Sequence, residues 1–544
     1  MKPALYSAPP AEATAVRPGY SPGVRADSSV SGPPIAYRRS IDENQRQTVA
    51  TGDTSGAGIA RNAFYLVVGQ VITTALAIVL SAALGRSLGP RDFGTYYLIT
   101  TMSAFAYVFA EWGQPYFVIR QVAREPLRSG DLLGTALVLR VVFTLIVATP
   151  AGLIAWALGY GARTTWLAVF LILAGLPLFL AQGYGMVFRA RDKMGRDATV
   201  SIANKAVALC ATLLALALAQ GIPGVILAQA VAGVAGLAVA GKLYGRMGTP
   251  PLRVSSETAR ELFGAGPPLL AMAAAVSVQP YLDAIILSKM APVAAVGWYG
   301  AAKNILGVLM APALILGAAA YPRIARASVD ATALRQEVRS AFRPLLWLGA
   351  LAGTGTYLFA GTAIDFIYGS RGFEPAAMIL KVFAPGLFLL FIDILLGNII
   401  YASGSATGLA VAKVASVVVG TTLDFLLIPL FQQRFGNGGI GVVVAFALSE
   451  FVVFAGAMIV LRGGILELST ALNAARALAA AGATVLLFQL LPPILPFVGV
   501  PLCVVVFTAA SVALGLVDGR DLNLLRTLVR QRTAVGAPAA DGGQ

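Results

Sequence analysis

Long apolar runs separated by short polar segments recur from residue 62 to residue 516. A helix of about 20 apolar residues is long enough to cross the ~30 Å hydrocarbon core of a bilayer. A transmembrane barrel would instead need alternating patterns about ten residues long, which this sequence lacks. The pattern therefore predicts an all-α polytopic membrane protein with about fourteen transmembrane helices. We expect these helices near residues 62–84, 94–113, 133–158, 165–188, 198–219, 222–243, 262–288, 294–319, 343–362, 376–400, 407–430, 438–461, 471–491 and 493–516.

Composition narrows the classes of function. Hydrophobic residues make up 58% of the chain and charged residues 12%, about half of the roughly 25% that is usual in a soluble domain. The mean hydropathy is +0.78. These values exclude an ordinary soluble enzyme, a disordered regulator and a secreted disulfide scaffold. The chain has no His, and its two cysteines, Cys210 and Cys503, lie inside apolar runs, where packing explains them better than a metal or redox site.

The two ends of the chain differ from the rest. Residues 1–60 are rich in Pro, Ser, Gly and Ala and have no apolar periodicity. Such a segment cannot bury enough apolar surface to offset the entropy of ordering, so we expect a disordered tail. No apolar stretch follows the first basic residues, which argues against a signal peptide. Residues 518–544 are expected to form a second, shorter tail.

The basic residues predict the orientation in the membrane. With the N-terminal tail on the cytoplasmic side, fourteen crossings leave all but 8 of the 40 Lys and Arg residues on cytoplasmic segments. This asymmetry is the one that the positive-inside rule requires, and it places both termini in the cytoplasm. The net charge of +15 is therefore explained by topology, and we expect no nucleic-acid partner.

A spaced motif occurs twice in the chain. Arg86, Gly94 and Tyr96 recur at the same spacing as Lys289, Gly297 and Tyr299. A second match pairs the segment that begins at Gly221 with the one that begins at Gly438. Six expected helices separate the copies in each case, so the copies have the same orientation, which predicts two six-helix bundles related by a parallel repeat. The expected organisation is a tail (1–60), a first bundle (61–245), a cytoplasmic linker (246–260), a second bundle (261–462), two additional transmembrane helices (463–517) and a tail (518–544).

Several of these segments resemble one family of transporters. They are the stretches 62–70, 85–96, 281–287, 296–303, 398–404 and 428–431, with Gly439 and Glu450 beyond. In order and spacing they resemble the polysaccharide transporters, or Wzx-type oligosaccharide flippases, of the multidrug/oligosaccharidyl-lipid/polysaccharide (MOP) exporter superfamily. The long tail before Asn62 and the lengthened turn 432–437 depart from the family pattern.

The resemblance implies a flippase in the inner membrane of a bacterium. Its substrate would be an oligosaccharide on a polyprenyl pyrophosphate, carried from the cytoplasmic to the outer leaflet by alternating access for surface or extracellular polysaccharide biosynthesis. Its partners would be that lipid-linked oligosaccharide, membrane lipids, and glycosyltransferases or a polymerase of the same pathway. Two alternatives within the superfamily stay open: a cation-coupled multidrug exporter and a lipid II flippase.

Ionisable residues at membrane depth are costly and are candidates for function. Four acidic residues lie within expected helices and are candidates for coupling to a H⁺ or Na⁺ gradient: Asp283, Asp393, Asp424 and Glu450. The alternative for each of them is a buried structural pair with a neighbouring helix.

Basic and polar residues are the candidates for binding the substrate. The basic candidates are Arg86, Arg140, Lys205, Lys289 and Lys303. They could contact an anionic head group, whereas snorkelling or topology offers an alternative explanation for the residues near helix ends. The polar candidates for binding sugar hydroxyls are Asn62, Gln70 and Gln279, although such residues more often join helices to one another.

No catalytic pattern accompanies these candidates. The sequence has no Gly-rich phosphate loop of the Walker type and no acidic pair in a large extramembrane segment. We therefore expect neither an enzyme nor a bound cofactor or metal, and we expect the driving force to be an ion gradient, the membrane potential or the substrate gradient. A glycosyltransferase or polymerase would need a long loop outside the membrane, which the sequence does not provide.

Overall fold

The computed structural model describes residues 56–517, apart from 329, 371, 462–466 and 493. The expected tails 1–60 and 518–544 lie largely or wholly outside this part of the chain. Within it every regular element is a helix, and there is no strand. This confirms the all-α fold predicted from the apolar runs.

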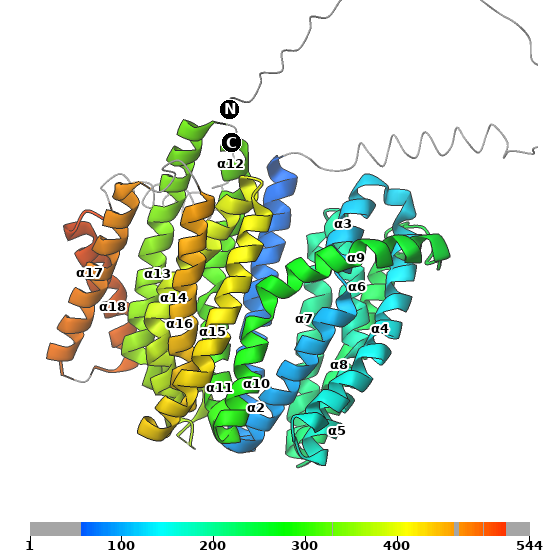
Figure 1. Ribbon diagram of the computed structural model, residues 1–544, viewed down its shortest axis with the longest axis horizontal. Coiled ribbons are helices and arrows are strands. Elements are labelled where there is room, and N and C mark those ends of the chain that lie inside the picture. Colours follow the sequence, from blue (N-terminus) through cyan, green and yellow to red (C-terminus); the bar gives the residue numbers. More distant parts are fainter. Residues whose placement is uncertain (1–55, 329, 371, 462–466, 493, 518–544) are drawn as a thin grey trace, which may run out of the picture. The chain divides into compact units, whose positions relative to one another are not determined.

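The first half of the described chain contains seven α-helices and one short 3₁₀ helix. They are α2 (Gly56–Glu111), α3 (Gln114–Arg124), η1 (Pro126–Arg128), α4 (Ser129–Ala157), α5 (Ala162–Ala174), α6 (Leu176–Ala190), α7 (Met194–Ala217) and α8 (Gly221–Gly245). Helix α2 turns at Gly89, whose positive φ of 71° is readily adopted by a residue without a Cβ, and Pro90 then begins the returning segment. In Figure 1 the two segments of α2 descend to the lower end of the molecule and rise again towards α3.

The second half contains ten helices. They are α9 (Ser256–Ser277), α10 (Gln279–Met290), α11 (Val293–Leu309), α12 (Ala311–Ala327), α13 (Ala331–Tyr368), α14 (Glu374–Ala402), α15 (Ala406–Phe435), α16 (Gly438–Val460), α17 (Leu468–Leu490) and α18 (Pro496–Ala513). Helices α13 to α16 pack on one another, and α17 and α18 pack on the outer side of α13 (Figure 1).

Within the described residues, eleven helices or helix pairs are long and apolar enough to cross a membrane, or up to twelve if the bent pair α9 and α10 is one span. The difference between twelve and the expected fourteen has two sources. Helix α2 counts once although it carries two expected segments, and α13 is not among the eleven. Every one of the fourteen expected segments nevertheless lies mainly on a helix of the structure.

Two expected loops are helical instead. The segment after Glu111 was expected to be a loop, but it forms the amphipathic helix α3, with Phe117, Val118 and Val122 buried. The segment between Arg323 and Arg343 was also expected to be a loop, but it continues α12 and begins α13, whose N-cap is the side chain of Asp330. Both segments are too polar to be predicted as membrane helices, and hydropathy alone therefore assigned them to loops.

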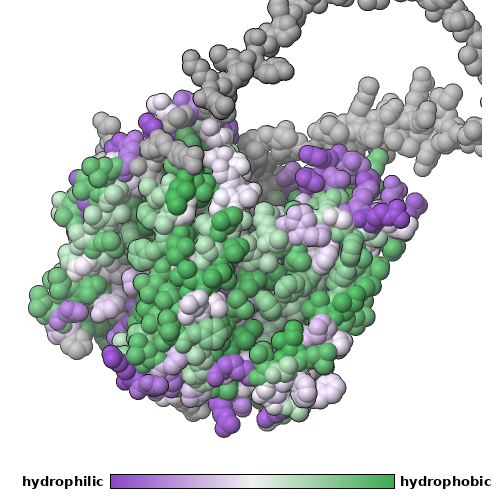
Figure 2. Space-filling view, viewed as in Figure 1, coloured by the Kyte–Doolittle hydropathy of each residue, from purple (hydrophilic) through white to green (hydrophobic). Residues whose placement is uncertain are grey.

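An apolar band surrounds the helices. Figure 2 shows hydrophobic residues across the middle of the molecule and hydrophilic residues gathered near its upper and lower ends. Large apolar side chains such as Trp156, Trp166 and Phe366 are more than 70% exposed. A soluble monomer rarely exposes so much apolar surface, whereas a lipid bilayer solvates it.

Repeat-related residues meet where the returning segment of α2 packs on α11. A Cβ added to Gly94 would lie 2.2 Å from the carbonyl oxygen of Val293, and one added to Gly297 would lie 2.2 Å from that of Pro90. Gly94 and Gly297 are equivalent in the repeated motif, and so are Pro90 and Val293. The contact is therefore reciprocal, which is the pattern that a two-fold relation between copies produces.

The close approach at Gly297 generates a stability prediction. We expect Gly297→Ala to lower the stability of the folded protein by about 1–3 kcal/mol, because the new methyl group meets backbone that cannot move aside. Thermal unfolding in detergent measures the effect. The matched control is Gly307→Ala on the same helix, where an added Cβ meets nothing within 4 Å. Equal melting temperatures for the two variants would contradict the packing argument.

Candidate functional site

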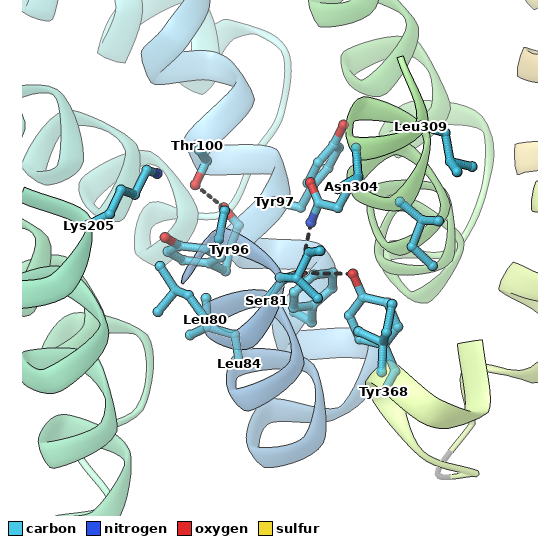
Figure 3. A pocket seen from close by; sticks show the side chains of 16 residues that line it. Leu80, Ser81, Leu84, Tyr96, Tyr97, Thr100, Lys205, Asn304, Leu309 and Tyr368 are labelled. Atoms are coloured by element: carbon cyan, nitrogen blue, oxygen red, sulfur yellow. Dashed lines mark hydrogen bonds between the residues drawn. The ribbon is translucent and has the colours of Figure 1, made fainter. Parts of the chain in front are cut away.

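A cavity of about 320 Å³ lies where the two halves meet, and we call it the central cavity. Both segments of α2 and Lys205 of α7 line it from the first half, while α11 and the end of α13 line it from the second half. Figure 3 shows Lys205 across the cavity from Tyr97, Asn304 and Tyr368. The cavity is thus bounded by elements of both halves.

A hydrogen-bonded network joins three helices at the wall of the central cavity. Asn304 Nδ2 of α11 donates to Ser81 Oγ of α2 at 2.9 Å. Ser81 Oγ also bonds to the hydroxyl of Tyr368 of α13 at 2.8 Å (Figure 3). The ring of Tyr368 stacks on Phe373 and touches Phe93 edge-on. Because this network crosses between the halves, a movement of one half relative to the other must break it.

A second cavity of about 380 Å³ lies among α2, α3, α4, α6 and α7, and we call it the N-half pocket. Its floor includes Arg140, whose side chain is 1% exposed. The guanidinium donates to Gln114 Oε1 at 3.1 Å, to Glu111 Oε1 at 3.1 Å and to the carbonyl of Phe179. It also lies 4.1 Å from the centre of the Phe179 ring. A buried charge needs this many partners to be stable, so the position of Arg140 is well defined.

The N-half pocket has a more exposed side. There Arg189 at the end of α6 donates to Asp197 Oδ2 of α7 at 2.8 Å. Deeper inside, Asn204 is 5% exposed, and its Nδ2 has no hydrogen-bond acceptor. Its neighbour Lys205 lines both the N-half pocket and the central cavity. Lys205 therefore lies between the two cavities.

A third cavity of about 610 Å³ is lined only by apolar side chains from α2, α4, α9 and α10, and we call it the apolar pocket. Trp112 closes one side of it, stacked on Phe263 and donating from its indole N–H to the Phe263 carbonyl at 3.1 Å. Gly266 permits this approach, because a Cβ there would overlap the Trp112 ring.

Four carboxyl groups, three of them buried and one half-buried, form a connected cluster with two lysines in the second half, which we call the acidic cluster. Asp283 of α10 and Asp424 of α15 are 2% and 1% exposed, and their carboxyl groups interact directly. Lys303 of α11 interacts with Asp283 and with Glu450 of α16. The other members are Asp393 of α14 and Lys413 of α15, which form an ion pair at 2.7 Å.

The acidic cluster holds an excess of negative charge. Its four carboxylates face two lysines, so full ionisation would leave two uncompensated negative charges in a low-dielectric region. Both oxygens of Asp424 and Oδ2 of Asp283 receive no hydrogen bond from any described residue. A proton shared between the two carboxyl groups would supply one, as in other close carboxyl pairs. Uptake of a proton would therefore lower the electrostatic cost of burying the cluster.

Two tyrosines connect the acidic cluster to the central cavity. Tyr299 of α11 interacts with Asp283, and its ring touches that of Tyr97 edge-on, with centroids 6.3 Å apart. Tyr97 in turn lines the central cavity. The cluster thus lies behind the cavity wall, and a change in its charge acts on residues that face the cavity.

Most of the predicted residues lie in or beside the N-half pocket and the acidic cluster. Arg140 and Lys205 line the N-half pocket, and Asp283, Asp393, Asp424, Glu450 and Lys303 belong to the acidic cluster. Gln279 lies close by, where it joins α10 to α16 through a 3.0 Å hydrogen bond to Ser449. Lys303 is also surrounded by the rings of Tyr299, Phe383 and Phe446.

The remaining predicted residues lie outside these cavities. Arg86 donates to the carbonyls of Phe366 and Ile367 at the end of α13, and Lys289 lies 3.2 Å from the centre of the Tyr160 ring. Gln70 is exposed and donates to Thr74 one turn further along α2. The side chain of Asn62 lies outside the part of the chain that the structure describes.

Sequence analysis missed several residues of these cavities. Ser81, Tyr368 and Asn304 are far apart in the chain, and no motif links them. Asn204 had a usable signal, because a buried amide beside Lys205 interrupts an otherwise apolar stretch of α7. Gln114 and Asp197 were hidden in segments that hydropathy assigned to loops or helix ends.

Comparison with known proteins finds a family match over part of the chain and a shared fold. Residues 59–328 match the family of polysaccharide biosynthesis proteins. No curated protein matches the sequence.

Solved transporters share the fold. The lipid II flippase MurJ, in an inward closed conformation, superposes with a TM-score of 0.68 at 11% identity, over 84% of this chain and 98% of its own. An inward-facing multidrug resistance MATE family transporter of the MOP superfamily superposes with a TM-score of 0.61 at 15% identity, over 73% of this chain and 98% of its own. A MOP superfamily transporter from Pyrococcus furiosus superposes with a TM-score of 0.55 at 13% identity, over 74% of this chain and 94% of its own. The family match over residues 59–328 and the shared fold support the resemblance expected from the sequence, to the polysaccharide transporters of the MOP superfamily.

Proposed function

We propose that the protein is a flippase for oligosaccharide linked to polyprenyl pyrophosphate. It would move this lipid from the cytoplasmic to the outer leaflet by alternating access, for surface or extracellular polysaccharide biosynthesis. The observation that carries the proposal is the central cavity, which both halves line, in a chain whose residues 59–328 match the polysaccharide biosynthesis family. Alternating access requires a binding site at such a boundary.

The three cavities suit the three parts of this substrate. Hydrated sugars and a pyrophosphate cannot cross hydrocarbon unaided, because their polar groups would lose water without replacement. The central cavity and the N-half pocket offer cationic and polar side chains, with Lys205 shared between them. The apolar pocket could hold part of the prenyl tail, whose remainder would stay in lipid.

The two halves would act as the moving units. We propose that these units are the bundles 61–245 and 261–462. Both termini would lie in the cytoplasm, and the protein would lie in the inner membrane of a bacterium. In support, the predicted outer end is closed by contacts between the halves: Arg86 binds the end of α13, and the Tyr160 hydroxyl bonds to Ser288 at 2.6 Å. These contacts would break in the outward-open state, and the cavity would then open outside.

We propose H⁺ as the coupling ion, with Asp283 and Asp424 as its binding pair and Asp393 and Glu450 in the same network. The excess of carboxyl groups over lysines in the acidic cluster supports a cation of some kind. A shared proton is favoured over Na⁺, because among the described residues no three acidic, Cys or His side chains are grouped to hold a metal ion. Gain or loss of a proton would alter the charge beside Tyr299 and Tyr97, and therefore the stability of one state of the cavity relative to the other.

The positions of the candidate substrate-binding residues suggest different roles for them. Arg140 and Lys205 are favoured for the head group, because they line the N-half pocket. Lys303 and Gln279 fit the coupling network better, whereas Arg86 and Lys289 fit the closed outer end. Asn62 and Gln70 stay candidates for sugar contacts, and glycosyltransferases or a polymerase of the pathway stay candidate partners.

Deletion of the gene in its host tests the transport function. We expect lipid-linked oligosaccharide to accumulate in the cytoplasmic leaflet and surface polysaccharide to be lost, because the head group has no other way across. Leaflet-selective labelling of the glycolipid measures the first effect, and a plasmid copy of the wild-type gene should reverse both. A normal glycolipid distribution together with raised drug sensitivity would overturn the proposal and favour the multidrug exporter.

The carboxyl pair generates a second prediction. Asp283→Asn and Asp424→Asn each keep the shape of the side chain but remove a titratable group. Because coupling between sites is typically worth about 1–3 kcal/mol, we expect stimulation of flipping by a pH gradient to fall roughly 5- to 150-fold. The measurement is flipping of lipid-linked oligosaccharide by purified protein in vesicles, with an imposed pH gradient or an imposed Na⁺ gradient.

The control for this experiment is Asp365→Asn. Asp365 lies on α13 near the predicted outer end, is exposed, and is not part of the acidic cluster. Its removal should leave the response to the gradient unchanged. If the variants at Asp283 and Asp424 respond to the pH gradient as wild type does, the proposed coupling pair is wrong; a response to Na⁺ alone would replace H⁺ as the ion.

A further inference from the structure

The charges that line the N-half pocket do not balance. The pocket contains three basic residues, Arg140, Arg189 and Lys205, and two carboxylates, Glu111 and Asp197. Arg140 pairs with Glu111 at 3.1 Å, and Arg189 pairs with Asp197 at 2.8 Å. Among the described residues no carboxylate pairs with Lys205. One positive charge is therefore left to attract a ligand.

The polar groups around Lys205 are built for a ligand with hydroxyls. Asn204 is 95% buried and contributes to the lining, while its Nδ2 lies against Gly236 of α8. Gln182, Thr73 and Ser201 add an amide and two hydroxyl groups to the lining, so the pocket offers both donors and acceptors.

We propose that the N-half pocket binds one acidic sugar of the oligosaccharide, a uronic acid, and that Lys205 holds its carboxylate. This inference rests on the proposed function and names the substrate class: the flippase would carry a glycan that contains a carboxylated sugar. The amide of Gln182 and the hydroxyl groups of Thr73 and Ser201 hold the ring hydroxyls. A single carboxylate matches a single unpaired cation, and the charge-assisted bond is among the stronger hydrogen bonds available.

The pyrophosphate fits this pocket less well than the uronic acid does. A pyrophosphate esterified at both ends carries more than one negative charge, whereas the pocket has one unpaired cation and two carboxylates that would repel it. The pocket volume of about 380 Å³ lies in the range of small-molecule sites. Because Lys205 also lines the central cavity, a sugar bound to it can connect to a chain that continues into that cavity.

Two matched probes test the proposal. One is a farnesyl-pyrophosphate-linked oligosaccharide that contains one glucuronate; the other is the same molecule with the carboxyl group reduced to an alcohol. Binding of each to the purified full-length protein is measured by calorimetry in detergent. We expect the wild-type protein to bind the acid at least about tenfold more tightly than the alcohol, because only the acid forms the charged bond to Lys205.

Three variants assign the effect to Lys205. Lys205→Gln should remove the preference by weakening binding of the acid to the level of the alcohol, whereas Lys205→Arg should retain the preference. The control is Lys193→Gln, which removes an exposed lysine in the turn before α7 and should behave as wild type. Thermal unfolding of each variant checks that the fold is intact.

The outcomes separate the failure of the inference from that of the proposed function. If wild type binds both probes equally tightly, or if Lys205→Gln keeps the preference, the acidic-sugar site is wrong and the flippase proposal stands. If neither probe binds, the flippase proposal fails and this inference with it. If inorganic pyrophosphate displaces both probes and Lys205→Gln weakens both equally, Lys205 binds the phosphates and the proposal is overturned.

Discussion

The rest of the structure depends on backbone contact between the halves at Gly94 and Gly297. Here two helices approach so closely that each glycine faces a carbonyl of the other helix. No side chain larger than hydrogen fits, so the approach itself specifies glycine at both positions. The contact holds the returning segment of α2 against α11 and thereby sets the distance across the central cavity, which both helices line. The contacts towards the predicted outer end follow the same reciprocity: Tyr368 of the second half packs on Gly85, and Tyr160 of the first half bonds to Ser288 at the equivalent position.

A second constraint is the cost of charge inside the second half. Removing one partner from a buried ionic pair usually costs several kcal/mol of folding stability. Six ionisable groups at this depth are therefore costly to the stability of the protein. Lysines at two positions offset part of the cost, and hydrogen bonds such as Gln279 to Ser449 hold the surrounding helices together. The remaining negative charge is next to Tyr299, which touches a residue of the cavity wall. A protein that needed only stability would gain by replacing these groups with apolar ones, so their presence argues for a functional use of their charge.

Hydropathy was sufficient to predict the helices, and depth was sufficient to single out Asp283, Asp424 and Glu450. Neither hydropathy nor depth could predict which of these residues contact one another. Most of the helices are apolar on all sides, so the sequence carries little information on how each one is rotated, and Asp283 meets Asp424 only because α10 packs against α15. The network of Ser81, Asn304 and Tyr368 was equally inaccessible, since three ordinary polar residues on three helices share no motif. Helix α3 was missed for a different reason: its polar side lowers the mean hydropathy, although its spacing of buried residues is helical.

The two halves share a fold but differ in the sign of their buried charge. The first half encloses Arg140 and Lys205 in a pocket with one cation unpaired, whereas the second half encloses four carboxyl groups against two lysines. If the halves arose by duplication, one copy has become suited to an anionic ligand and the other to a cation. A ligand shifts a conformational equilibrium only as far as it binds one state better than the other. The two sites lie on opposite sides of the central cavity, with Lys205 at one wall and Tyr97, in front of the acidic cluster, at the other. A ligand bound at either site would therefore act on the same cavity from its own side.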